Sequence, residues 1–262
     1  MCSQKLKLQY YIENSSKVTE PVRLAVLTDL HSTLYGQGQE DLVEMLSGQK
    51  PDAVLLVGDI ADNKVSHRGT QTLLAAIGHK YPCFYVSGNH EYWSGEAEAI
   101  KKMIASYGVM VLEGERRVLE VKGQKLQICG VDDPSGVTGY ASFDTQTGGW
   151  EKQLWDCQDS LEARQYSVLM SHRPELTDFY TDSGFDLVVA GHAHGGQVRI
   201  PWILNGLFAP GQGLFPRYAG GQYTLGETSM IVSRGLCRNV LPRIFNRPEL
   251  VIVDILPEAD GT

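Results

Sequence analysis

The chain has 262 residues and a mass of 28.9 kDa, which is enough for one large domain with a buried core. Its composition, 42% hydrophobic and 21% charged, excludes a disordered chain, a fibre or a repeat array. Lys and Arg number 23 against 31 Asp and Glu, and the net charge of −8 argues against binding along a nucleic-acid backbone. Because the sequence contains no repeat and no linker, we expect a single domain over residues 1–262.

No apolar stretch reaches 18 residues, and residues 1–20 lack the apolar core of a signal peptide. The five cysteines form no CxxC pair and lie singly, which is typical of reduced thiols in a reducing compartment. We therefore expect a cytoplasmic protein. The cysteines are Cys2, Cys83, Cys129, Cys157 and Cys237.

Short apolar runs alternate with amphipathic stretches along the chain. Five runs predict strands that are covered on both faces, at residues 23–27, 53–57, 83–86, 166–170 and 186–189. Residues 39–47, 70–79 and 96–107 have helical spacing, so the first 110 residues predict βαβ units and a mainly parallel sheet. Later in the chain, 117–121 and 125–131 predict a hairpin, and 230–233 and 250–256 predict strands that we expect to be antiparallel. The fold class is α/β with mixed sheets.

Each of the five apolar runs is followed by polar residues that commonly bind metals. Because the carboxyl ends of parallel strands open into one crevice of an α/β sheet, we expect these side chains to meet there. In chain order the residues are Asp29 and His31, then Asp59, then Asn89 and His90, then His172, and finally His192 and His194.

Histidine is concentrated at these strand ends, which hold five of the seven histidines; only His67 and His79 lie elsewhere. A single histidine after a strand is commonly a hydrogen-bonded core residue. Five histidines in one crevice, with two aspartates and an asparagine, would leave many buried polar groups unpaired, at about 1–3 kcal/mol each. Bound metal ions would remove that cost, so the pattern predicts a metal centre.

The set of donors indicates the metal chemistry. Imidazole nitrogens with carboxylate and amide oxygens, and no thiolate, suit Mn, Fe or Zn ions and argue against Ca²⁺ or a structural zinc site. The donors are too many for one tetrahedral ion, so we expect two ions that share Asp59. Two divalent ions and two aspartates leave a charge of about +2, which attracts phosphate and stabilises its transition state.

Five motifs in this order and spacing resemble those of the calcineurin-like metallophosphoesterases, over most of the chain. The resemblance implies a four-layer sandwich of two mixed β-sheets flanked by helices. It also implies two divalent ions, with Mn expected to support activity, and hydrolysis of a phosphodiester or diphosphate by a bridging hydroxide. The motifs are Asp29-Leu30-His31, Gly58-Asp59, Gly88-Asn89-His90-Glu91, Ser171-His172 and Gly191-His192-Ala193-His194.

The resemblance also assigns roles to single residues. His90 is implied to protonate the leaving oxygen, aided by Asp29, and not to bind metal. The ligands of the first ion are implied to be Asp29, His31, Asp59 and His194, and those of the second Asp59, Asn89, His172 and His192.

Residues 195–198, 233–236 and 245–249 resemble one branch of this family, the membrane-associated phosphodiesterases, which includes UDP-2,3-diacylglucosamine pyrophosphatase-like proteins. The resemblance makes a lipid-linked or nucleotide-diphosphate phosphoester the candidate substrate, and raises peripheral contact with a membrane. The chain departs from the branch at Ala193, where Thr is common, and in lacking an apolar anchor within residues 1–20.

Two further features have open interpretations. Residues 200–216 are unusually apolar for a loop, and form either a lip for an acyl chain or membrane surface, or a loop folded over a sheet edge. Arg234, directly after a predicted strand, is the best candidate in a basic tail to bind a second phosphate, against the alternative of a solvated surface arginine.

Two other functions compete with phosphoester hydrolysis. A metallohydrolase of carbon esters or amides is one alternative, although the chain has no HExxH helix. A non-catalytic scaffold on the same fold is the other, although such a protein would be expected to have lost a ligand or His90.

Overall fold

The computed structural model describes residues 4–136, 148–238 and 243–258; Cys2 lies outside these ranges. Two six-stranded sheets form the centre of the molecule. The first has the order β1-β14-β2-β3-β4-β5, with bounds Lys7–Ser15, Glu249–Pro257, Val22–Leu27, Ala53–Val57, Cys83–Val86 and Met110–Val111. The second has the order β12-β13-β9-β8-β7-β6, with bounds Gly221–Leu225, Thr228–Val232, Leu187–Ala190, Tyr166–Met170, Gln124–Gly130 and Glu115–Val121.

All five strands predicted from continuous apolar runs are present as β2, β3, β4, β8 and β9. Every residue of β3, β4, β8 and β9 is buried, as expected for strands covered on both faces. The parallel pairs β2·β3, β3·β4 and β8·β9 direct their carboxyl ends to the same end of the molecule. The five strands are divided between the two sheets, so the expected crevice lies between two sheets rather than along one.

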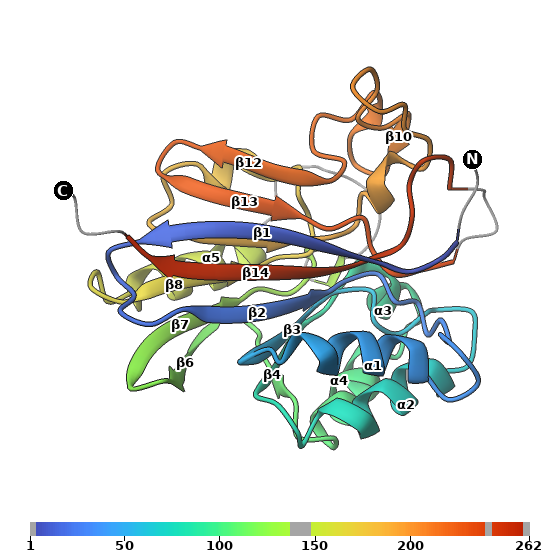
Figure 1. Ribbon diagram of the computed structural model, residues 1–262, viewed down its shortest axis with the longest axis horizontal. Helices are drawn as coiled ribbons and strands as arrows, with labels where there is room; N and C mark the ends of the chain where they lie inside the picture. The colour runs from blue at the N-terminus through green and yellow to red at the C-terminus, as the bar shows by residue number, and fades with distance from the viewer. Residues whose placement is uncertain (1–3, 137–147, 239–242, 259–262) are drawn as a thin grey trace.

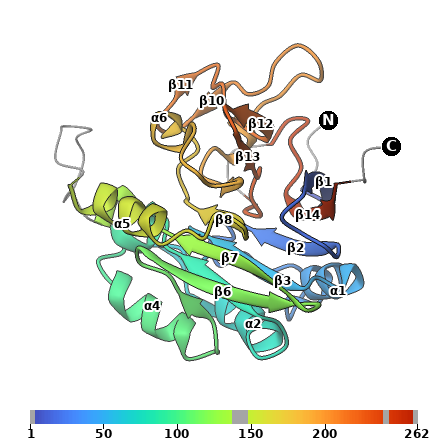
Figure 2. The ribbon, with the colours of Figure 1, turned by 90° about the vertical axis from the view of Figure 1, so that its left-hand side faces the viewer.

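Helices cover the outer faces of both sheets (Figure 2). On the first sheet lie α1 (Glu40–Gln49), α2 (Arg68–Ile77) and α4 (Ala97–Ala105), which bury Leu42, Leu73 and Ile100 against it. On the second lie α5 (Gly148–Asp159) and α6 (Thr177–Tyr180), whose Trp150 and Tyr180 are fully buried. A separate apolar cluster fills the space between the sheets. The predicted four-layer sandwich is confirmed.

The remaining elements are short. They are α3 (Asn89–Trp93), the 3-10 turns η1 (Pro134–Gly136) and η2 (His194–Gly196), and the small hairpin of β10 (Phe208–Ala209) and β11 (Gly213–Leu214). In the described part of the chain no helix is long and apolar enough to cross a membrane. Cys83, Cys129, Cys157 and Cys237 are buried, as predicted, and none of them forms a disulfide within the described residues.

The predicted hairpin is present as β6 and β7. The expectation that the last two strands are antiparallel is half wrong. β13 is antiparallel to β12 but parallel to β9, and β14 is antiparallel to β2 but parallel to β1. Strand β1 was not predicted, because it is an edge strand in which exposed and half-buried residues alternate. Because β1 lies beside β14 at the edge of the first sheet, β14 has a parallel neighbour.

Candidate metal centre

The loops after β2, β3, β4, β8 and β9 carry all the sequence-predicted site residues except Arg234. The backbones of the first two loops are joined, because the Asp29 N–H donates to the Gly58 carbonyl (3.0 Å) and the His31 N–H to the Asp59 carbonyl (2.9 Å). In Figure 1 these loops lie at the end of the molecule to which the arrow of β2 points. The structure therefore brings together side chains that are up to 165 residues apart in the sequence.

The backbone at this centre is strained. Five of the predicted metal ligands have left-handed backbone conformations, which cost a non-glycine residue about 1–3 kcal/mol. Such strain persists where the surrounding structure imposes it and is concentrated at functional sites. These residues are Asp29 (φ 49°), His31 (47°), Asp59 (51°), His192 (62°) and His194 (46°).

Two glycines allow the loops to approach each other. A Cβ at Gly58 (φ 75°) would lie 2.3 Å from Nδ1 of His172, and one at Gly88 would lie 2.3 Å from Oδ1 of Asp59. Both positions exclude any side chain, so His172 and Asp59 occupy the space that only glycine leaves.

Asp59 lies between two groups of ligands. Its Oδ2 is 3.2 Å from Nε2 of His172 and 3.6 Å from Nε2 of His31. On one side the rings of His31 and His194 have centroids 5.3 Å apart, and on the other those of His172 and His192 are 5.1 Å apart. Asp59 belongs both to a potential metal-binding group with His31 and His90 and to one with His172 and His192.

Asp29 lies near one histidine of each pair. Its Oδ1 is 3.7 Å from Nε2 of His194 and 3.9 Å from Nε2 of His172, and both of its oxygens accept the His192 N–H. Asp29, Asp59, Asn89 and His172 are all buried.

Four buried polar atoms at this centre have no hydrogen-bond partner. A buried polar atom without a partner costs about 1–3 kcal/mol, and four of them at one point fit bound cations. The mixed nitrogen and oxygen donors suit a divalent transition metal. The four atoms are Nε2 of His31, Oδ2 of Asp59, Oδ1 of Asn89 and Nε2 of His172.

Hydrogen bonds at the far side of three rings explain why Nε2 is the free nitrogen. Nδ1 of His31 is 3.0 Å from Oδ2 of Asp62, and Nδ1 of His172 is 2.9 Å from the Val57 carbonyl. Nδ1 of His194 is 3.1 Å from Sγ of Cys237. An acceptor at Nδ1 fixes the proton there and leaves the Nε2 lone pair for a metal, as is usual for histidine ligands.

The electrostatics of the centre favour positive charge. Burial disfavours the imidazolium of His172, but Asp59 and Asp29 outweigh burial and raise its pKa to about 10. The pKa of His31 is raised as well, because its hydrogen bond with Asp62 and the charges of Asp59 and Asp29 together outweigh burial. At His172 and His31 the carboxylates therefore stabilise a bound proton. A divalent cation, which has a greater charge, would be bound more strongly than a proton at the same place.

His192 has a different environment. The Arg173 guanidinium lies 3.0 Å from its Nε2, and burial together with that charge lowers the pKa of His192 far below its ordinary value. Its ring is therefore neutral, as a metal ligand must be. Asp133 holds Arg173 in place by accepting from Nε (2.6 Å) and NH2 (3.0 Å). Asp133 thus borders the centre through Arg173.

His90 lies at the edge of the centre and is half-buried. Its Nδ1 is 3.0 Å from Oδ1 of Asn63 and 3.6 Å from Oδ2 of Asp62, and its ring packs edge-on against His31 with centroids 4.3 Å apart. Asp62 and Asp59 both offer carboxylate oxygens near this ring, and the assistance of His90 by Asp29 stays a prediction.

Glu91 joins the loops that carry Asp59 and Asn89. Its fully buried carboxylate accepts the backbone N–H of Asp59 (3.0 Å), Ala61 (3.0 Å) and Gly88 (2.8 Å). Burial and the neighbouring Asp59 raise the pKa of Glu91 to about 7, against the effect of these three hydrogen bonds. Sequence reasoning recorded Glu91 as part of a motif but gave it no role.

Arg234 does not lie among the metal-ligand side chains. It follows β13, and its Nε is 3.5 Å from Oε2 of Glu249. The next residue, Gly235, approaches Asp29 so closely that a Cβ on it would lie 2.7 Å from that of Asp29. Arg234 is therefore anchored beside the centre while its side chain lines a neighbouring pocket.

Residues 22–196 match the sequence model of the calcineurin-like phosphoesterases, Metallophos. The chain belongs to this family. It is accordingly a metal-dependent hydrolase of phosphoester bonds, and the family provides the metal requirement that the donor set of the centre indicates.

Curated relatives agree with this assignment. The chain is 29% identical over 239 residues to a metallophosphoesterase of Campylobacter jejuni, Cj0846, covering 89% of this chain but 59% of that protein. It is 25% identical over 260 residues to the phosphodiesterase YaeI of Escherichia coli, covering 95% of this chain and 86% of the relative.

Solved structures share the fold. The phosphopantetheinyl hydrolase of Mycobacterium tuberculosis superimposes with a TM-score of 0.52 at 14% identity, covering 93% of this chain and all of that one. A dimetal phosphatase from Danio rerio gives a TM-score of 0.53 at 13% identity, covering 82% of this chain and 88% of that one.

Proposed function

We propose that the chain hydrolyses a phosphodiester or diphosphate with two divalent metal ions, and that Asp59 is the ligand shared between them. One ion would be held by Asp29, His31, Asp59 and His194, and the other by Asp59, Asn89, His172 and His192. The observation that carries this proposal is the convergence of four unpartnered buried atoms, on His31, Asp59, Asn89 and His172.

Bound at this position, a pair of divalent ions would lower the pKa of a shared water, supply a hydroxide nucleophile and neutralise the phosphate charge. The chain's own part is to hold the donors rigid. Glu91 fixes the loops of Asp59 and Asn89, and the hydrogen bonds at Nδ1 orient His31, His172 and His194. Mn²⁺ is the first ion to test, because mixed imidazole and carboxylate donors suit it.

His90 is the proposed general acid. Its Nδ1 donates to Asn63 and lies beside Asp62, so Nε2 carries a proton when the ring is the imidazolium. That proton would pass to the leaving oxygen as the bond from phosphorus to that oxygen breaks, leaving His90 neutral. The rings of His31 and Trp93 on either side of His90 limit its rotation.

A diester or diphosphate is favoured over a monoester by the position of Arg234. Its backbone lies beside the centre, and its guanidinium, which lines the neighbouring pocket, would bind a second phosphate group of the substrate. The E. coli relative is named a phosphodiesterase, which supports the same class of substrate.

A panel of phosphoesters tests the proposal directly. We expect hydrolysis of bis-p-nitrophenyl phosphate with Mn²⁺, Fe²⁺ or Zn²⁺, and loss of both metals and of turnover in Asp59→Asn. Asp156→Asn, at an exposed position on α5, is the matched control and should be fully active. Activity only on peptide or acyl substrates, or full turnover in Asp59→Asn, would contradict it.

A further inference from the structure

The chain carries an exposed apolar surface next to the pocket that Arg234 lines. Large apolar side chains project from residues 200–215 and from Phe245, most fully at Trp202, whose side chain is completely exposed, and Ile203, which is 82% exposed. We call this surface the apolar tip. It consists of Ile200, Trp202, Ile203, Leu207, Phe208, Leu214, Phe215 and Phe245.

Backbone hydrogen bonds hold the loops of the apolar tip in place. Ile200 and Leu204 exchange backbone hydrogen bonds (3.0 and 2.8 Å), and the Leu207 N–H donates to the carbonyls of Gly196 and Val198 (both 2.9 Å). The Arg199 N–H donates to the Ile244 carbonyl (3.0 Å), which fixes Phe245 beside the loop. Because Gly196 is the last residue of the η2 turn that begins at His194, the tip is attached to the metal-centre loops.

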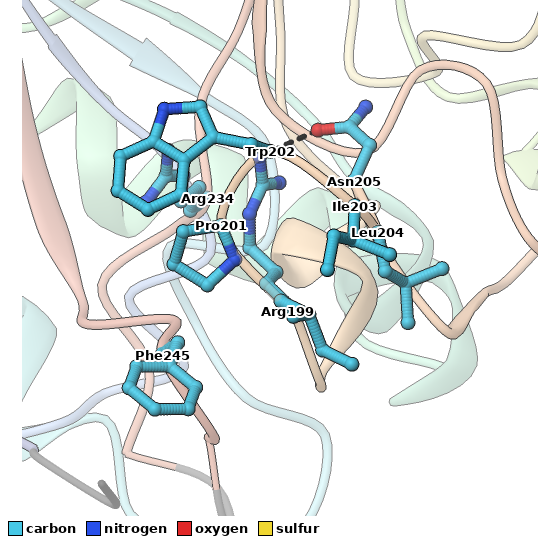
Figure 3. A pocket seen from close by; sticks show the side chains of 9 residues that line it. Arg199, Pro201, Trp202, Ile203, Leu204, Asn205, Arg234 and Phe245 are labelled. Carbon is cyan, nitrogen blue, oxygen red and sulfur yellow. Dashed lines mark hydrogen bonds between the residues drawn. The ribbon is translucent and has the colours of Figure 1, made fainter.

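A pocket of about 500 Å³ opens within the tip. Figure 3 shows Trp202, Pro201 and Phe245 on one side of the Arg199 side chain and Ile203, Leu204 and Asn205 on the other, with the Arg234 guanidinium behind Trp202. NH1 of Arg199 and Nε of Arg234 are buried and have no hydrogen-bond partner. Burial and the neighbouring Arg234 lower the pKa of Arg199 to about 10, so an anion between the two arginines would be favourable.

The charge around the tip is opposite to that of the whole chain. Residues 197–247 contain six arginines, no lysine or aspartate and a single glutamate, whereas the chain carries a net charge of −8. Apolar side chains that include Trp and Phe, surrounded by arginines, match the interface of a bilayer that contains anionic lipids. The combination of projecting apolar residues with guanidinium nitrogens that lack a hydrogen-bond partner, NH1 of Arg199 and Nε of Arg234, favours a lipid surface over a protein partner.

We propose that the apolar tip docks onto the surface of a bilayer containing anionic phospholipids, with a lipid phosphate held by Arg199 and Arg234. Trp202, Ile203 and Phe245 would enter the boundary between headgroups and acyl chains. Figure 1 shows the loops around β10 at the same end of the molecule as the arrowhead of β2, so docking would bring the metal centre close to the membrane. This proposal does not depend on the catalytic one, because it can be measured without turnover.

Sedimentation with large unilamellar vesicles tests it. We expect the chain to bind vesicles of phosphatidylcholine with phosphatidylglycerol, and to bind vesicles of phosphatidylcholine alone, or either kind at high salt, much more weakly. Trp202→Ser with Ile203→Ser should reduce partitioning by at least about tenfold, because each side chain buries its apolar surface in the interface.

Matched controls separate docking from general loss of structure. Trp155→Ser removes an equally large exposed residue from α5, away from the tip, and should leave vesicle binding unchanged. Arg199→Gln should weaken binding to anionic vesicles, while Arg117→Gln, an exposed arginine on β6, should not. All variants should hydrolyse soluble bis-p-nitrophenyl phosphate at the wild-type rate if the wild type does so.

Several outcomes would overturn docking. No binding to any vesicle would do so, as would equal loss in Trp155→Ser and in the tip variant. Self-association through the tip would assign the surface to a second copy of the chain instead. Light scattering would then show a dimer of the wild type that the double variant Trp202→Ser with Ile203→Ser does not form, and the wild type would not bind vesicles. Failure of phosphodiester hydrolysis together with intact, tip-dependent vesicle binding would leave docking supported.

Discussion

Nε2 of His172 lies 3.2 Å from Oδ2 of Asp59, and neither atom has a hydrogen-bond partner. Both atoms are fully buried, and the residues come from strands of different sheets, β8 and β3. A base and a carboxylate this close require a positive charge, which a proton on His172 supplies in the metal-free protein and a bound metal ion would supply in its place. Most of the predictions below follow from that requirement.

The metal-free protein should lose stability as the pH rises. The pKa of His172 is raised from 6.5 to about 10 in the folded chain, so the imidazolium contributes stability that is fully present below pH 6.5 and is lost as the pH rises through about 10. Thermal unfolding with a chelator should show Tm falling over this interval. This fall in Tm should be absent in metal-loaded protein and in His172→Asn. Identical curves of Tm against pH for the metal-free protein, the metal-loaded protein and His172→Asn would contradict the raised pKa of His172.

Metal binding should release protons for the same reason. At pH 7 the proton on His172 must leave before Nε2 can bind an ion, so metal affinity should fall about tenfold for each pH unit below neutrality per proton displaced. Calorimetric titration in buffers of different ionisation enthalpy measures the number of protons. Binding without proton release would show that His172 is not a ligand.

Asp62 should act on metal affinity without binding metal. It accepts from Nδ1 of His31 (3.0 Å), and loss of such a partner lowers metal affinity about 10–100-fold. We expect that loss in Asp62→Ala and a smaller one in Asp62→Asn, whose amide oxygen can still accept. Asp156→Ala is the control at an exposed position. Equal affinities in Asp62→Ala and in the control would exclude the positioning role.

Glu91→Gln should affect both stability and the centre. Replacing one carboxylate oxygen by an NH2 group sets a donor against backbone N–H groups and costs roughly 1–3 kcal/mol of unfolding free energy. Metal content should fall as well, because the loops of Asp59 and Asn89 separate. Glu98→Gln, at a side chain that is 75% exposed, should change neither denaturant unfolding nor metal content.

His90→Ala should distinguish leaving groups. Without the acid, hydrolysis of alkyl esters should slow by about 10²–10⁴-fold, while aryl esters with good leaving groups should lose far less. Both metals should remain bound, because His90 is not among the proposed ligands. The exposed His79 provides the control His79→Ala. An equal loss on both ester classes would argue against proton donation by His90.

The sequence predicted the strands and the ligand-bearing loops because both signals are local. Continuous apolar runs read as buried strands, and polar residues directly after them read as site residues, as in β3 with Asp59. Edge strand β1 was not predicted because Tyr10, Ile12 and Asn14 are exposed and most of its other residues are only half-buried. That omission also hid the parallel partner of β14.

The contacts around the ligands could not be predicted, because they join residues that no local pattern connects. Asp62 reaches His31 across 31 residues, and Cys237 reaches His194 across 43. Cys237 is one of four buried cysteines, and nothing in the sequence distinguishes it from the other three. The division of the five strands between two sheets likewise depends on tertiary packing, which the strand pattern does not encode.

Crystals of the protein loaded with Mn²⁺, measured at the manganese absorption edge, test the central claim most directly. We predict two anomalous peaks about 3.5–4 Å apart on either side of the Asp59 carboxylate, one near His31 and His194 and one near His172 and His192. A single peak, or two peaks that do not share Asp59, would contradict the account.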